Sequence, residues 1–249
     1  MPIYNQILEK SQQGRKQLAI LVDPDKVLNR DIELIARNAA KAGADYFFVG
    51  GSLLVTNEMD RCIKTLKANG NIPVILFPGN TMQMSTKADG ILFLSLISGR
   101  NAEMLIGLHV IAAPYLKLSP LEVISCGYML IESGQTTAVQ YMSNTRPIPS
   151  EKNEIAICTA MAGEMLGLKL IYLEAGSGAR NSVPLPMIQQ VKQSIGIPLI
   201  VGGGLQTPEK AAGAASSGAD IVVVGTAIEN DFTLIAEMVD AVHGVSKNE

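Results

Sequence analysis

Short, nearly continuous apolar runs alternate along the chain with segments whose apolar residues recur at helical spacing. The apolar runs occupy residues 17–23, 45–51, 73–79, 90–96, 126–134, 169–176, 198–204 and 220–226. Strands that are apolar on both faces are typical of a parallel sheet that is covered by helices. Eight such strands within 249 residues predict an α/β protein, a TIM (β/α)8 barrel that forms one domain over residues 1–249.

The intervening segments predict helices, because their apolar residues repeat at three- and four-residue intervals. These segments are residues 31–44, 59–70, 102–113, 153–167, 186–196, 208–218 and 232–244. Only the ten residues NTMQMSTKAD separate the third and fourth strands, which is too short for a full crossover helix. We therefore expect a modified barrel with an irregular or missing third helix. The polar, proline-containing residues 135–152 predict a long loop after the fifth strand.

Composition limits the classes of function. The chain is 47% hydrophobic and 17% charged, and its net charge of -3 gives no support for a nucleic-acid-binding surface. No apolar run reaches the roughly 18 residues that a transmembrane helix needs, and the N-terminal residues lack the apolar centre of a secretory signal. Cys62, Cys126 and Cys158 have no metal-type spacing, which indicates reduced cysteines and a cytoplasmic protein.

Polar residues and glycines gather where the predicted strands end. In TIM barrels this rim carries the active site. Two glycine turns, GGG at 202–204 and GT at 225–226, follow the seventh and eighth strands. Glycine lets backbone amides approach a phosphate, and helix N-termini favour anions, so the two turns predict a phosphate site. The alternative is that these glycines only make tight turns.

The motif LVDPDK places carboxylates at the end of the first strand. Asp23 suits Mg²⁺, which typically takes one or two carboxylates together with substrate phosphate oxygens. Ser52, at the end of the second strand, adds a hydroxyl. Helix capping and loop solvation are the alternatives, and they are favoured for Asp25. Lys26 is equally suited to binding phosphate and to facing water.

The stretch IYLEAGSGAR ends the sixth strand with Glu174. A carboxylate there can accept hydrogen bonds from substrate hydroxyls and take a proton, and Tyr172 lies on the same side of the strand. The alternative is a structural glutamate paired with Arg180. Glu132 and Ser133 are weaker candidates. His109 and His243 lie in apolar helical stretches that favour structural roles.

Five motifs together carry a resemblance to a known family. LVDPDK, VGGS, YLEAGSGA, VGGGL and VVVGTAIEND occur in this order between about residues 18 and 232, and they resemble the geranylgeranylglyceryl phosphate synthases. The match favours the second subgroup, which archaea and some bacteria share. It implies a modified TIM barrel that lacks a regular third helix. It also implies a magnesium-dependent prenyltransferase of archaeal-type phospholipid biosynthesis. The substrates would be sn-glycerol 1-phosphate and geranylgeranyl diphosphate or another prenyl diphosphate, joined by an ether bond with release of diphosphate.

The resemblance also implies the site. Asp23 and Ser52 would hold Mg²⁺, and Glu174 would act with Asp23 in catalysis. The residues implied to bind glycerol phosphate are Tyr172, Leu173, Glu174, Ala175, Gly176, Ser177, Gly178, Gly203, Gly204, Gly225 and Thr226. Two positions depart from the first subgroup, which has lysine where this chain has Leu21 and asparagine where it has Thr226. Both departures fit the second subgroup.

Other functions stay open on the sequence alone. A phosphosugar isomerase or synthase on the same barrel would use the two glycine turns equally well. A non-catalytic protein that binds a phosphate ligand, or a structural assembly protein, would also fit. We expect a homo-oligomer, a dimer or a hexamer. The sequence does not place the groove that a prenyl tail needs.

Overall fold

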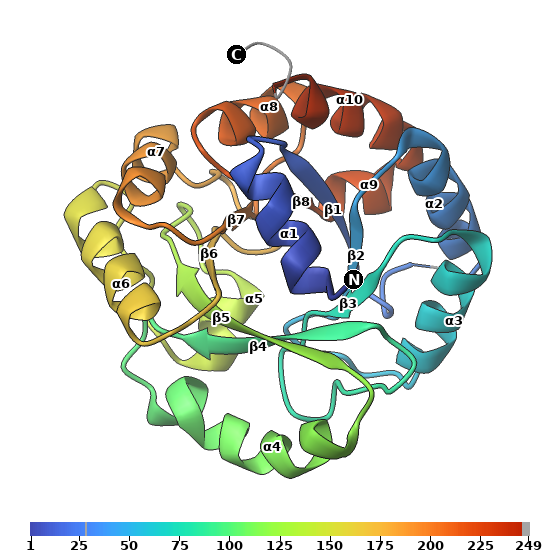
Figure 1. The fold of residues 1–249 in the computed structure, drawn as a ribbon, viewed down its shortest axis with the longest axis horizontal. Helices are drawn as coiled ribbons and strands as arrows, with labels where there is room; N and C mark the ends of the chain where they lie inside the picture. The colour runs from blue at the N-terminus through green and yellow to red at the C-terminus, as the bar shows by residue number, and fades with distance from the viewer. Residues whose placement is uncertain (28, 246–249) are drawn as a thin grey trace.

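A computed structural model describes residues 1–27 and 29–245 of the chain. Eight parallel strands hydrogen-bond in sequence order and close into a barrel, with β8 paired to β1 (Figure 1). The strands are β1 (Gln17–Val22), β2 (Tyr46–Val49), β3 (Val74–Leu76), β4 (Gly90–Leu96), β5 (Glu122–Leu130), β6 (Leu170–Glu174), β7 (Leu199–Gly202) and β8 (Ile221–Val224). The predicted TIM barrel is confirmed.

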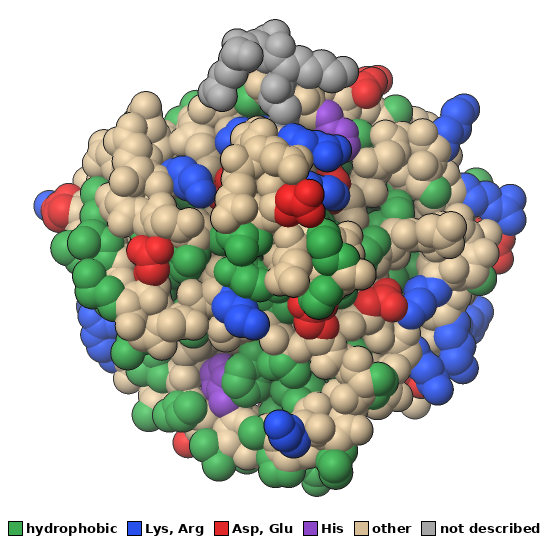
Figure 2. All heavy atoms as spheres, viewed as in Figure 1, with side chains coloured by type: hydrophobic (Ala, Val, Ile, Leu, Met, Phe, Trp, Pro, Cys, Tyr) green, Lys and Arg blue, Asp and Glu red, His purple; other side chains and the backbone are tan. Residues whose placement is uncertain are grey.

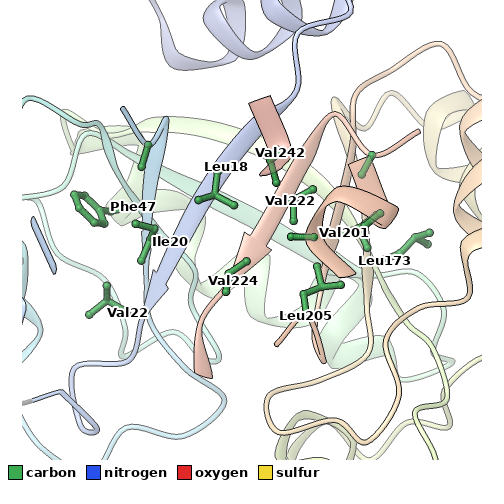
Figure 3. Packing of buried hydrophobic residues seen from close by; sticks show 14 of the residues in the cluster. Leu18, Ile20, Val22, Phe47, Leu173, Val201, Leu205, Val222, Val224 and Val242 are labelled. Atoms are coloured by element: carbon green, nitrogen blue, oxygen red, sulfur yellow. The ribbon is translucent and has the colours of Figure 1, made fainter. Parts of the chain in front are cut away.

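Alternation along each strand divides its side chains between two cores. Leu18, Ile20 and Phe47 point outward and pack beneath the helices (Figure 3). Tyr46 and Tyr172 point inward and help to fill the barrel itself. Both layers are buried, which explains why the strands have apolar sequences without polar alternation.

Helices surround the barrel, as Figure 1 shows. They are α1 (Ile3–Gln12), α2 (Asn29–Ala42), α3 (Met59–Asn69), α4 (Leu108–Leu118), α5 (Ala138–Ser143), α6 (Asn153–Met165), α7 (Leu185–Ser194), α8 (Pro208–Ser216), α9 (Thr226–Asn230) and α10 (Ile235–Val245). A π-helical turn, η1 (Glu103–Gly107), precedes α4, and a 3-10 turn, η2 (Phe232–Leu234), precedes α10. Residues 77–89, all of which the structure describes, form turns without a helix. The helix that would join β3 to β4, which is the third crossover helix of a regular barrel, is therefore missing, as expected.

The N-terminal helix α1 was not expected from the sequence. It lies across the N-terminal mouth of the barrel (Figure 1). The Glu122 carboxylate accepts hydrogen bonds from the backbone amides of Ile3 and Tyr4, the second at 2.9 Å. A carboxylate is favourable at a helix N-terminus. Strand β5 starts at the charged residue Glu122, where its backbone pairs with Gly90 of β4, and so begins before the apolar run expected from residue 126.

The region predicted as a long loop needs one correction. Within residues 135–152 the structure has the short helix α5, and an isolated bridge joins Ile131 to Ile148. No cysteine of the described residues forms a disulfide, and Cys62 and Cys126 are buried. Within the described part of the chain, no helix has the length and apolar character needed to cross a membrane.

Candidate active site

The carboxyl ends of the strands enclose a polar cavity of about 290 Å³. It brings together most of the residues that the sequence singled out. Its walls include Asp23, Ser52, Tyr172, Glu174, Gly176, Ser177, Gly178, Gly203, Gly204, Gly225 and Thr226. Leu173 and Ala175 are buried in the outer core, so only their backbones lie near the cavity. The sequence thus predicted a set of residues that the fold assembles from five different strand ends.

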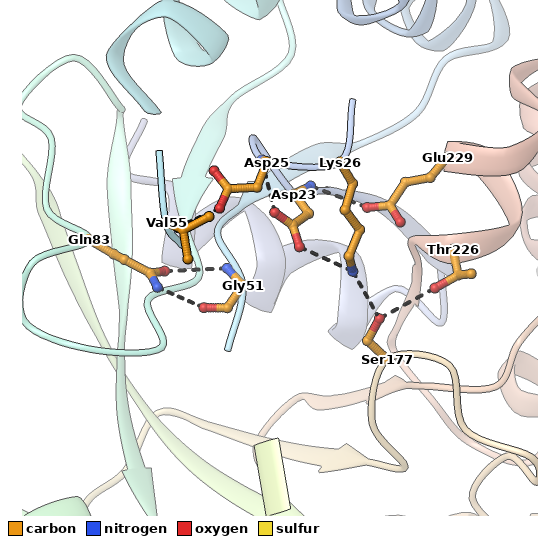
Figure 4. Close-up of polar contacts among 9 residues, drawn as sticks. All are labelled: Asp23, Asp25, Lys26, Gly51, Val55, Gln83, Ser177, Thr226 and Glu229. Atoms are coloured by element: carbon orange, nitrogen blue, oxygen red, sulfur yellow. Dashed lines mark hydrogen bonds and ion pairs between the residues drawn. The ribbon is translucent and has the colours of Figure 1, made fainter. Parts of the chain in front are cut away.

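Asp23 is fixed at the end of β1 by its neighbours (Figure 4). Its carboxylate Oδ1 accepts a hydrogen bond from the Asp25 amide at 3.1 Å, and Oδ2 lies 3.1 Å from the Lys26 ammonium. Its own amide donates to Glu229 Oε1 at 3.3 Å. Burial raises the pKa of Glu229, which lies beside Asp23 in the same cavity. Asp23 is 7% exposed, so its carboxylate is directed into the cavity rather than into bulk water.

The surroundings of Asp23 fit a metal ion that is shared with a substrate. The turn after β2 comes so close that a Cβ at Gly51 would lie 3.0 Å from Asp23 Oδ2, and Ser52 follows Gly51 in the wall. Among the described residues, no group of three or more His, Cys, Asp and Glu side chains could form a complete metal cage. Mg²⁺ commonly needs only one or two carboxylates, with water and phosphate oxygens completing its shell. Asp23 and Ser52 meet that smaller requirement.

Asp25 has a different role from Asp23. Its carboxylate accepts hydrogen bonds from the Val55 amide and from the amide and hydroxyl of Thr56. These contacts tie the loop after β1 to the loop after β2. The favoured structural interpretation of Asp25 is consistent with this geometry.

Glu174 and Tyr172 lie on the inner face of β6. Glu174 is 4% exposed, and Oε1 accepts a hydrogen bond from the Gly176 amide at 2.6 Å. Burial raises the pKa of Glu174 to about 7, which suits a group that must take up a proton near neutral pH. The buried Tyr172 hydroxyl lies beside the Glu174 carboxylate, and both groups face the cavity. Arg180 is exposed, and no contact with Glu174 supports the alternative of a structural pair.

The glycine turns bring backbone close to Glu174. Gly203 has a positive φ of 85°, and a Cβ there would lie 2.5 Å from Glu174 Oε1 and 2.6 Å from the Gly176 nitrogen. Only glycine fits such a position without displacing the backbone. The turns after β6 and β7 are therefore packed directly against each other. They present backbone to the cavity, as the predicted phosphate site requires.

A second, apolar cavity of about 220 Å³ lies between β4 and α4. We call it the apolar groove. It shares Gly51, Ser52, Phe77, Tyr128 and Val139 with the polar cavity, so the two adjoin at these residues. Its walls include Ile91 and Leu96 of β4, and Ala112 and Leu116 of α4.

His109 also lines the apolar groove. Its ring packs edge-on against Phe93 at a centroid distance of 4.4 Å, and burial lowers its pKa. At neutral pH it is therefore an uncharged part of the wall. His243 pairs with Asp45 at 2.9 Å, ahead of β2, so neither histidine takes part in the polar cavity.

Sequence reasoning missed two polar residues and the apolar groove. Glu229 stands within the motif VVVGTAIEND and could have been found from its place after the last glycine turn. Gln83 exchanges hydrogen bonds with both backbone groups of Gly51, at 3.3 Å and 2.8 Å, and so fixes the turn beside Asp23. No local pattern marked Gln83, because it lies in the segment that replaces the third helix.

The chain is similar to one protein family, to curated proteins and to solved structures. The model of the PcrB family matches residues 11–246. The geranylgeranylglyceryl phosphate synthase of Chitinophaga pinensis is 52% identical over 244 residues, which cover 98% of this chain and 97% of that protein. The protein of the same name from Korarchaeum cryptofilum is 42% identical over 224 residues, or 90% of this chain and 92% of that protein.

The chain is also similar to solved structures of proteins with this name. The (S)-3-O-geranylgeranylglyceryl phosphate synthase from Thermoplasma acidophilum, in complex with sn-glycerol-1-phosphate, superimposes with a TM-score of 0.92 at 33% identity. The match covers 98% of this chain and 99% of that chain. Tryptophan synthase of Mycobacterium tuberculosis, at 13% identity and a TM-score of 0.61, shares the fold alone.

Proposed function

Because this chain belongs to the PcrB family, we propose that it is a prenyltransferase that makes geranylgeranylglyceryl phosphate. It joins sn-glycerol 1-phosphate to geranylgeranyl diphosphate through an ether bond and releases diphosphate. The observation that supports this reaction best is the junction of two cavities. A polar cavity with a buried carboxylate meets an apolar groove at Ser52, so one ligand can place a phosphate and another a long tail at the same point.

The residues around the polar cavity account for the chemistry. The turns at 176–178, 203–204 and 225–226 would bind the phosphate of glycerol phosphate through backbone amides and the Ser177 and Thr226 hydroxyls. Tyr172 and Glu174 would orient the glycerol hydroxyl. Its oxygen attacks the allylic carbon, the bond from that carbon to the diphosphate oxygen breaks, and Glu174 takes the hydroxyl proton.

We infer that Asp23 and Ser52 hold Mg²⁺ together with the diphosphate. The support is the buried Asp23 carboxylate and the close turn at Gly51. Bound there, Mg²⁺ supplies positive charge that stabilises the leaving diphosphate. Glu229 and Asp25 act one step further out, because Glu229 accepts a hydrogen bond from the Asp23 amide and the Asp25 amide donates one to the Asp23 carboxylate.

The apolar groove is our candidate for the prenyl site. It extends along β4 from Leu96, near the rim, to Ile91, near the strand's start. Helix α4 runs back in the opposite direction, so Leu116 lies deeper along the groove than Ala112. A tail that enters at Ser52 would therefore pass Ala112 before it reached Leu116.

Ala112→Trp is expected to shift the enzyme towards shorter prenyl diphosphates. The indole would block the groove at Ala112, and every methylene that loses its place beyond that point forfeits about 0.8 kcal/mol of burial. We expect kcat/KM for geranylgeranyl diphosphate to fall about tenfold or more relative to geranyl diphosphate, measured with both in competition. Lys64→Trp is the control, because Lys64 is exposed on α3 and does not line the groove. An unchanged preference in Ala112→Trp would rule out this groove as the tail site.

A product assay tests the function directly. Purified protein is incubated with Mg²⁺, either sn-glycerol 1-phosphate or its 3-phosphate enantiomer, and prenyl diphosphates of several lengths. We expect an ether product from the 1-phosphate only, and none when EDTA replaces Mg²⁺. No product with retained phosphate binding would favour the isomerase or the binding protein instead.

We also infer that the protein is a homo-oligomer. On the outer face of α4, Val110, Tyr115 and Leu118 are all more than half exposed. Figure 2 shows hydrophobic side chains at the surface over α4, at the bottom of the view. A helix that is apolar all round is normally covered. Light scattering on the purified protein would give the number of subunits, and a monomer would contradict the inference.

A further inference from the structure

The charges around the polar cavity are poorly matched to its proposed ligands. Three carboxylates, Asp23, Glu174 and Glu229, line it. Lys26 is the one cationic side chain among the described residues of its wall. The proposed substrates bring a phosphate and a diphosphate to this cavity. The position of this single lysine therefore matters for both.

Lys26 bridges the two halves of the site (Figure 4). Its ammonium lies 3.1 Å from Asp23 Oδ2 on the metal side and 3.4 Å from Ser177 Oγ on the phosphate side. The Ser177 hydroxyl in turn lies 3.4 Å from the Thr226 hydroxyl, at the start of α9. One ammonium thus contacts the loop after β1 and the turn after β6 at the same time.

The backbone that carries Lys26 is fixed, whereas its side chain is only loosely held. The Lys26 amide donates to the Asp23 carbonyl at 3.1 Å, and Asp25 anchors the loop to residues 55 and 56. The Lys26 side chain is 50% exposed. A long, half-exposed lysine can change its partner without any movement of the loop.

We propose that Lys26 is a phosphate-binding residue that exchanges partners when the metal binds. This inference rests on the proposed function. With Asp23 free, the ammonium neutralises its carboxylate. A Mg²⁺ ion held by Asp23 would compete with the ammonium for that carboxylate and repel it, and Lys26 would then pair with the phosphate of glycerol phosphate beside Ser177 and Thr226.

Metal and glycerol phosphate would therefore strengthen each other's binding. The metal releases a lysine that the phosphate needs, and the phosphate removes a cation that competes for Asp23. Such coupling is reciprocal and can be measured from either ligand.

Calorimetry on the full chain tests the coupling. sn-Glycerol 1-phosphate is titrated into wild type, Lys26→Met, Lys26→Arg and Lys64→Met, each with Mg²⁺ and with EDTA. We expect Mg²⁺ to tighten binding in wild type. Lys26→Met should bind about tenfold or more weakly with Mg²⁺, because a charge-assisted hydrogen bond is lost, and Mg²⁺ should then have almost no effect. Lys64 is exposed on α3, so Lys64→Met should match wild type, and Lys26→Arg should recover part of the affinity.

Metal binding gives a second readout that does not depend on activity. Without phosphate, Mn²⁺ binding is followed by electron paramagnetic resonance. Lys26→Met should bind Mn²⁺ as tightly as wild type or more tightly, because the competing ammonium is gone. Weaker Mn²⁺ binding would show that Lys26 only supports the Asp23 loop, and would overturn the proposal.

The outcomes separate this proposal from the proposed function. If wild type binds sn-glycerol 1-phosphate and Lys26→Met binds it equally well with Mg²⁺, the role of Lys26 is wrong and the function stands. If wild type does not bind it under either condition, the proposed function itself fails. Should Lys26→Met unfold, Lys26→Gln keeps a polar side chain and is judged by the same criteria.

Discussion

Asp23→Asn is expected to lower prenyl transfer about a thousandfold. The substitution keeps the size of the side chain and an oxygen for the Asp25 amide, but it removes the charge that would hold Mg²⁺. Charge stabilisation by a bound metal is worth several kcal/mol, and each 1.36 kcal/mol changes the rate tenfold. The measurements are ether product per unit time at saturating substrates and the concentration of Mg²⁺ that gives half the maximal rate.

Asp25→Asn is the matched control for Asp23→Asn. The two carboxylates lie in the same loop, yet Asp25 is bound to Val55 and Thr56 and does not line the polar cavity. We expect its variant to keep most of the activity. Equal losses in the two variants would show that the loop's shape matters, and not the charge of Asp23. Near-normal activity of Asp23→Asn would remove that residue from the metal site.

Glu174→Gln is expected to lower kcat by roughly 10²–10⁴-fold, the usual contribution of a positioned general base. Glutamine can still accept the hydrogen bond from the Gly176 amide, so the turn keeps its partner. Glu132→Gln, at an exposed position just after β5, is the control and should remain active. Unchanged turnover in Glu174→Gln would return Glu174 to a purely structural role.

The same variant should change the pH dependence. The pKa of Glu174 is about 7, so the fraction of Glu174 that is an ionised carboxylate, able to accept a proton, decreases as the pH falls below that value. We expect kcat/KM of wild type to fall in proportion below about pH 7. The phosphate of the substrate titrates near pH 6 and affects both proteins alike. The part of the decrease in kcat/KM that is absent in Glu174→Gln is the part that the Glu174 carboxyl causes.

Stability should move in the opposite direction to activity in Glu174→Gln. Burial raises the folded-state pKa from 4.5 to about 7, so the native protein binds the proton more tightly than the unfolded chain. The stabilising contribution of the protonated carboxyl is therefore complete below pH 4.5 and is lost as the pH rises through 7. At 1.36 kcal/mol per pKa unit the loss amounts to roughly 3 kcal/mol. Above pH 7 the variant should melt at a higher temperature than wild type, which also verifies that it folds.

The barrel could be predicted from the sequence because its strands are buried on both faces. The run at residues 90–96 became β4 with the same limits, and the ten-residue gap before it indeed holds no helix. Helix α1 was missed because its role depends on Glu122, over a hundred residues away. A local pattern cannot show that a carboxylate will bind a helix N-terminus so distant in sequence.

The candidate site residues that directly follow strands could be predicted from the sequence, whereas a cavity that depends on side-chain packing could not. Asp23, Glu174 and the glycine turns could be read from their positions after apolar runs. The apolar groove could not, because Leu116 would look the same in a sequence whether it packed against β4 or left space for a ligand. Leu173 shows a related limit, since its motif implied a ligand contact whereas the alternation of β6 turns its side chain into the outer core.

The apolar groove has a consequence for turnover. If the groove holds the prenyl tail as proposed, the tail would bury the same surface in the substrate, in the transition state and in the finished ether, and the groove would bind all three equally. Uniform binding of this kind selects the substrate but does not accelerate the reaction, which leaves the rate to Asp23, Glu174 and their partners. The product keeps its tail and loses only the diphosphate. Transfer of the product from the groove into water would cost about 0.8 kcal/mol for each methylene of the tail that becomes exposed. Release into an apolar phase such as a lipid bilayer would offset that cost, whereas release into water would not.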